Sequence, residues 1–74
     1  MAKEYLVALF PRSRRVLVNG ALMGTTNKKL ELESGRYEVT LGPPKTFIPE
    51  KHDIDLQNTS SLMPMIVEFE EGES

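Results

Sequence analysis

The sequence predicts an all-β fold, a small antiparallel β-sandwich of about seven short strands. Three observations lead to this prediction. Apolar and polar residues alternate with a period of two in several segments, as at Tyr37, Val39 and Leu41, which polar residues separate. Turn residues recur about every eight residues. No long window shows the 3.6-residue apolar period that an amphipathic helix requires.

The expected strands follow in order from this alternation and from the turns between them. The first, Glu4–Phe10, is apolar on both faces, which predicts a central or covered strand. The later strands each have one apolar and one mostly polar face, because side chains two residues apart share a face. They are expected at Arg15–Val18, Ala21–Met23, Lys29–Glu33, Arg36–Leu41, Lys51–Gln57 and Leu62–Phe69. A frayed, solvated acidic tail is expected at 70–74.

Turn residues separate these strands. Asn19-Gly20 predicts a type I′ hairpin, because both residues tolerate the positive φ that this turn needs. Ser34-Gly35 predicts a second tight hairpin. Gly42-Pro43-Pro44 ends the strand before it, because proline cannot donate a backbone hydrogen bond to a sheet. One wall of the core is expected to consist of Leu30, Leu32, Tyr37, Val39 and Leu41.

Length and composition restrict the classes of protein that the chain can be. Its 74 residues fit a single domain over 1–74, and the absence of cysteine excludes a disulfide framework and a thiolate zinc site. A domain this short buries only about 60% of its unfolded surface. We therefore expect a protein partner, self-association or a larger parent protein to support it. A net charge of -2 disfavours nucleic acid as the partner.

The chain carries no targeting or membrane signal that the sequence makes visible. No apolar run approaches the ~20 residues that span a bilayer, and the run from Tyr5 to Phe10 is too short for a signal peptide. As written, the sequence predicts a cytoplasmic protein. An extracytoplasmic location is expected instead if the chain is a domain excised from a larger protein.

The centre of the chain has the pattern of a known family. Residues Val16–Leu41 read VLVNGALMGTTNKKLELESGRYEVTL: an apolar strand, an Asn-Gly turn, a short strand ending in Gly-Thr, an alternating strand, a glycine turn and a Tyr-x-Val-x-Leu strand. This segment resembles a PEGA domain, a small β-rich module of bacteria and archaea that is related to surface-layer proteins. The resemblance covers roughly residues 15–69. Asn27 stands where the family usually has proline, and the Pro-Glu-Gly-Ala string is absent.

The resemblance implies a non-catalytic protein-interaction or spacer module without a cofactor. PEGA domains are commonly appended to secreted, surface or signalling proteins. Such a module would act through its sheet edges or through an exposed apolar face, and the first and last strands are the expected places.

Arg12, Arg14 and Arg15 form the one concentrated basic cluster and are candidate partner contacts. Their presence supports an alternative function, binding of a polyanion or a nucleic acid. The competing interpretation is a solvated turn, since no aromatic stacking platform accompanies the arginines. Phe47 lies in a proline-flanked loop. It is a candidate recognition tip, or else it plugs one end of the sandwich.

Catalysis and metal binding are not predicted. His52 and Asp53 are neighbours on an expected strand, so their side chains point to opposite faces and cannot easily cooperate. Asp53 and Asp55 share a face, but the Asp-x-Asp-x-Asp-Gly pattern of a calcium loop is missing. Filling of the core is the default expectation for the adaptable apolar residues Met63, Pro64, Met65, Leu22 and Met23. Leu22 or Ile66, on otherwise polar faces, would mark a contact with another chain.

Overall fold

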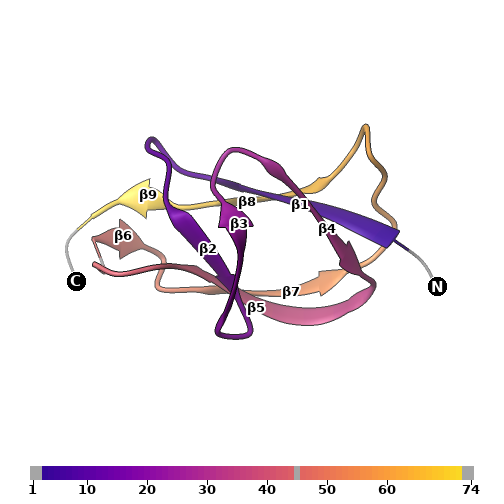
Figure 1. Ribbon diagram of the computed structural model, residues 1–74, viewed down its shortest axis with the longest axis horizontal. Helices are drawn as coiled ribbons and strands as arrows, with labels where there is room; N and C mark the ends of the chain where they lie inside the picture. The colour runs from indigo at the N-terminus through magenta and orange to yellow at the C-terminus, as the bar shows by residue number, and fades with distance from the viewer. Residues whose placement is uncertain (1–2, 45, 73–74) are drawn as a thin grey trace.

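The computed structural model describes residues 3–44 and 46–72, and these residues form an all-β sandwich (Figure 1). The strands are β1 (Lys3–Leu9), β2 (Arg15–Val18), β3 (Ala21–Thr25), β4 (Lys29–Glu33), β5 (Gly35–Leu41), β6 (Phe47–Ile48), β7 (His52–Leu56), β8 (Met65–Glu68) and β9 (Glu70–Glu71). The predicted fold class is confirmed. All seven predicted strands are present, with ends shifted by up to three residues.

Two sheets pack face to face around one core. One has the strand order β4-β1-β8 and the other the order β3-β2-β5-β7, while β6 and β9 pair separately at one end. Figure 1 shows the first sheet above the second, with β6 and β9 on the left. The side chains between the sheets are the buried apolar residues Leu6, Ala8, Phe10, Val16, Val18, Leu32, Val39, Leu41, Phe47, Leu56, Val67 and Phe69.

β1 is the central strand of its sheet, as its two apolar faces predict. Leu6 and Ala8 are fully buried, and Tyr5, Val7 and Leu9 on the other face are half-buried. β1 runs antiparallel to β4 but parallel to β8. The parallel pair departs from the predicted antiparallel sandwich. Residue alternation specifies which face of a strand is buried and carries no information on strand direction, which the long β7–β8 connection leaves open.

The Asn19-Gly20 hairpin between β2 and β3 is confirmed. Asn19 has a φ of 51° and Gly20 a φ of 85°, the two positive values that a type I′ turn requires. Asn19 also extends the pairing of β2 with β5. Its backbone N–H donates to the Glu38 carbonyl oxygen at 2.8 Å, and its side-chain oxygen accepts from the Glu38 N–H at 2.8 Å.

The predicted hairpin at Ser34-Gly35 is wrong. β4 and β5, on either side of it, belong to different sheets, so the chain crosses there from one layer of the sandwich to the other. Gly35 supplies the turn with a φ of 148°. The predicted single core wall is therefore divided. Leu30 and Leu32 lie on β4, and they are in the sheet opposite the core residues of β5.

The end of the chain is paired where a frayed tail is predicted. Glu70 and Glu71 are exposed, yet they form β9 and pair with Ile48 and Phe47 of β6. Strands of two residues are too short to show alternation, which is why the sequence does not reveal them. Residues 73–74 of the predicted tail lie outside the described residues.

Candidate interaction surfaces

Arg14 is half-buried, and its guanidinium forms hydrogen bonds within the molecule. One of its terminal nitrogens donates hydrogen bonds to the carbonyl oxygens of Gly42 and Pro44, and the other donates to the Thr46 hydroxyl at 3.4 Å. These acceptors lie in the connection between β5 and β6. Arg14 therefore holds this connection against the segment between β1 and β2.

Phe47 is buried, with 3% of its surface exposed. Its ring packs edge-on against Phe69, with the centroids 5.7 Å apart, and His52 packs on Phe69 in the same way at 4.8 Å. The Arg14 guanidinium carbon lies 5.6 Å from the ring centroids of both Phe47 and Phe10. Phe47 therefore fills the end of the sandwich, the second of the two roles predicted for it, and is not an exposed recognition tip.

The other two arginines have different environments from Arg14. Arg12 forms a salt bridge with Glu71 at 2.9 Å, and both side chains are exposed. Arg15 is exposed on β2. The buried Thr26 hydroxyl fixes the segment by donating to the Arg12 carbonyl oxygen at 2.7 Å and accepting from the Arg14 N–H at 2.9 Å. The three residues that the sequence groups together thus do not present one free basic cluster.

His52 and Asp53 point to opposite faces of β7, as predicted for neighbours on a strand. The Nε2–H of His52 donates to the Glu68 carbonyl oxygen at 2.7 Å, which joins β7 to the edge of the other sheet. Asp53 is exposed on the outer face. The described residues contain no group of three or more His, Asp or Glu side chains placed to hold a metal ion.

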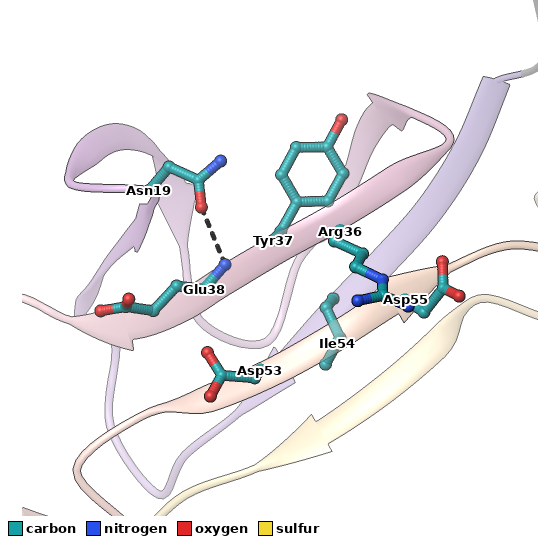
Figure 2. A pocket seen from close by; sticks show the side chains of 7 residues that line it. All are labelled: Asn19, Arg36, Tyr37, Glu38, Asp53, Ile54 and Asp55. Carbon is teal, nitrogen blue, oxygen red and sulfur yellow. Dashed lines mark hydrogen bonds between the residues drawn. The ribbon is translucent and has the colours of Figure 1, made fainter.

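A groove of about 510 Å³ lies over β5 and β7, and most of the residues that line it are polar or charged (Figure 2). The strand register places Arg36 opposite Asp55, and Glu38 opposite Asp53. Lys51 approaches Glu38 to 3.6 Å. The lining residues are Asn19, Arg36, Tyr37, Glu38, Asp53, Ile54 and Asp55. They include no serine, threonine, cysteine or histidine, and the charged residues Arg36, Glu38, Asp53 and Asp55 are all exposed.

The outer face of the β4-β1-β8 sheet is apolar along its centre. Tyr5, Val7 and Leu9 of β1 are half-buried there, and Ile66 of β8, in register with Val7, is 48% exposed. We call these four residues the β1 face. At its border, the Lys29 ammonium lies 5.5 Å from the centre of the Tyr5 ring. An apolar centre with a charged border is the usual make-up of a protein contact surface.

The turn Ser60–Met63, here called the Leu62 loop, stands beside the β1 face. It lies in the connection between β7 and β8, which projects at the top right of Figure 1. Leu62 is 93% exposed and Met63 is 77% exposed. The prediction of core filling is therefore wrong for Met63, as it is for the exposed Leu22 and Met23, whereas Met65 does pack against the core. Backbone hydrogen bonds in both directions join Ser60 and Met63. Lys29 donates to the carbonyl oxygen and the hydroxyl of Ser61 at 3.0 and 2.6 Å.

The sequence predicts Ile66 as a contact and places Leu62 and Met63 in the last expected strand, Leu62–Phe69, but it does not predict that these two residues lie in a loop. Ile66 carries a local signal, since it is an apolar residue at a strand position where alternation predicts a polar one. Leu62 and Met63 carry none, because their exposure depends on Lys29 and other residues far away in the sequence. No helix in residues 3–44 and 46–72 is long and apolar enough to cross a membrane. Comparisons with protein-family models, with curated proteins and with solved structures find no match.

Proposed function

We propose that this chain is a non-catalytic protein-interaction or spacer module of the PEGA type, and that the β1 face and the Leu62 loop together form its contact surface for a partner protein. The observation that carries the proposal is the exposure of Leu62, Met63 and Ile66 beside the half-buried apolar side chains of β1. Lys29 links the loop to the β1 face, since its ammonium lies near the Tyr5 ring and donates to Ser61. Large exposed apolar patches on soluble proteins usually mark interaction sites.

The Leu62 loop is well suited to such a contact. Its tip is apolar, and its base is held by the hydrogen bonds from Lys29 and within the Ser60–Met63 turn. Since these hydrogen bonds already hold the loop backbone, little backbone entropy would be lost when a partner covers it. Full burial of one large apolar side chain contributes about 1.5–3 kcal/mol, so covering Leu62, Met63 and Ile66 would offset part of the cost of association.

The experiment is affinity capture with the full chain from its native cells, using wild type, Ile66→Glu and Asp53→Asn. Ile66→Glu places a charge in the β1 face, while Asp53→Asn alters the outer face of the opposite sheet and serves as the matched control. Circular dichroism and the melting temperature first establish that both variants fold. We expect wild type and Asp53→Asn to retain the same partner and Ile66→Glu to lose it.

The partner found in this way is then purified, and its affinity is measured for each form of the chain. Weakening by at least about tenfold, or about 1.4 kcal/mol, in Ile66→Glu supports the proposed surface. Equal affinities for all three forms reject it.

A further inference from the structure

The four outer strands of the two main sheets differ in how well they are protected against pairing with another strand. These strands are β3 and β7 in one sheet, and β4 and β8 in the other. An edge strand presents unpaired backbone N–H and C=O groups, and proteins usually protect such edges with charges, prolines or capping side chains. Within the described residues, no strand pairs with the outer side of β3.

Three of the edges carry such protection. β7 has the carboxylates of Asp53 and Asp55, and the side chains of β4 alternate with charges at Lys29, Glu31 and Glu33. Pro64 precedes β8, and His52 occupies the Glu68 carbonyl oxygen at the end of that strand. β3 differs from all of these. Its sequence Ala-Leu-Met-Gly-Thr contains neither a charge nor a proline, and Ala21, Leu22 and Met23 are all exposed.

The absence of charge on β3 indicates which strand could pair with it. A two-fold axis between identical strands places each side chain near its own symmetry mate or a close neighbour. Self-pairing of β7 would bring aspartates together, and self-pairing of β4 would bring Glu31 near its copy, both of which are destabilising. Self-pairing of β3 opposes no charges, because the strand has none.

We infer that β3 pairs antiparallel with β3 of a second copy of this chain, with Leu22 of one protomer opposite Leu22 of its partner. Leu22 is 61% exposed and is in register with Leu17, which is itself in register with Thr40. The pairing would continue this row of side chains across the dimer and cover part of each Leu22 side chain. It uses the sheet opposite to the β1 face and so goes beyond the proposed function.

The contact is expected to be short. The register between β2 and β3 shifts between Val16 and Leu17, which leaves Met23 as an extra residue on the edge. A bulge of this kind limits regular pairing to the few residues around Leu22. The dimer should therefore form reversibly and should depend on protein concentration.

The chain lacks cysteine, so single cysteine variants of the full protein test the inference directly. Hydrogen-bonded antiparallel partners have Cα atoms about 5.5 Å apart, within the range that a disulfide spans. Under mild oxidation we expect Leu22→Cys to form a covalent dimer faster than Leu62→Cys. Leu62 is the more exposed residue, so random collisions would favour cross-linking there. Cross-linking of Leu22→Cys at or below the rate of Leu62→Cys overturns the inference.

Sedimentation over a wide concentration range provides the second measurement. We expect wild type to self-associate and Leu22→Lys, which opposes two like charges, to weaken association at least about tenfold, while Leu62→Lys leaves it unchanged. A wild-type chain that remains monomeric up to about 1 mM overturns the inference. Association lost in Ile66→Glu but kept in Leu22→Lys also overturns it and assigns the self-contact to the β1 face. Partner capture by Leu22→Lys tests the proposed function separately.

Discussion

The carboxylate of Glu4 accepts two hydrogen bonds from Thr59, one from its hydroxyl at 2.6 Å and one from its backbone N–H at 2.8 Å. The Thr59 hydroxyl also accepts a hydrogen bond from the Tyr5 N–H at 2.8 Å. β8 begins to pair with β1 only at Leu6. Thr59 therefore bonds to Glu4 and Tyr5, the two residues before Leu6, where β1 has no partner from β8. This contact joins the start of β1 to the base of the connection that carries the Leu62 loop.

Acid should weaken this contact. The hydroxyl hydrogen bond, followed by the backbone hydrogen bond, lowers the pKa of Glu4 from its ordinary value of 4.5, against a smaller opposing effect of burial. Because the pKa is lower in the folded state, the stabilisation is present above pH 4.5 and is lost as the pH falls through the folded value. We expect Glu4→Gln to be less stable than wild type at neutral pH and to lose less stability in acid.

Urea denaturation of both proteins across this pH range measures the effect. Other carboxylates titrate in both proteins, so the difference between their curves isolates Glu4. Parallel curves for wild type and Glu4→Gln would show that the contact with Thr59 does not stabilise the charged form.

Asn27 has a backbone conformation that proline cannot adopt. Its φ is 64°, its N–H donates to the Ala8 carbonyl oxygen at 2.7 Å, and its side-chain amide bonds to both backbone groups of Phe10. Proline fixes φ near −65° and has no N–H. We expect Asn27→Pro to lose well over about 1 kcal/mol of unfolding free energy, whereas Asn27→Gly keeps the backbone and loses about 1 kcal/mol.

Denaturant unfolding of the two variants distinguishes these effects, since only the proline variant loses the backbone geometry. The result also bears on the PEGA resemblance, because the family usually has proline at this position. A proline variant as stable as the glycine variant would mean that the turn at Asn27 adopts another conformation.

The features that the sequence predicted are local, and those that it missed are not. The Asn19-Gly20 hairpin follows from the φ preferences of two adjacent residues, and the central place of β1 follows from its own apolar faces. The same local information made Ser34-Gly35 resemble a hairpin. A short turn within one sheet and a corner between two sheets use the same small residues, and only the partners of β4 and β5 distinguish them.

The same reasoning explains the outcome at the candidate site residues. The sequence makes Arg14 a candidate contact as part of a basic cluster, and Phe47 either a recognition tip or a plug for the sandwich; both lie in expected loops, where side chains are usually solvated. The burial of Phe47 and the half-buried position of Arg14 depend on each other and on Phe69 at the far end of the chain, a combination of three distant segments that no local pattern contains.

Arg14 should therefore matter more to stability than the exposed arginines. Lysine keeps the positive charge but cannot donate several hydrogen bonds in one plane while stacking on Phe10 and Phe47. We expect Arg14→Lys to lower the free energy of unfolding by about 1–3 kcal/mol. Arg12→Lys, whose partner Glu71 is exposed, should change it by less than about 1 kcal/mol. Thermal or urea unfolding of the two variants tests this prediction. Equal losses of unfolding free energy in Arg14→Lys and Arg12→Lys would show that the hydrogen bonds and ring contacts of Arg14 do not add to stability.

The two aspartates of β7 provide a matched test of the charges across the groove. Asp53 lies opposite Glu38, a like charge, and Asp55 lies opposite Arg36, an opposite charge. Cross-strand charge pairs change stability by about 0.2–1 kcal/mol. Asparagine has the same shape as aspartate, so the substitutions isolate the charge. We expect Asp53→Asn to stabilise the fold and Asp55→Asn to destabilise it.

Both groups are exposed, and salt screens interactions between such groups. The opposite effects of Asp53→Asn and Asp55→Asn should therefore converge as the ionic strength rises, which urea unfolding at low and high salt measures. Lys51, 3.6 Å from Glu38, already offsets part of the repulsion with Asp53. The gain in Asp53→Asn should consequently be larger in a Lys51→Gln background. Effects of the same sign in both aspartate variants would contradict the register-based assignment of charges.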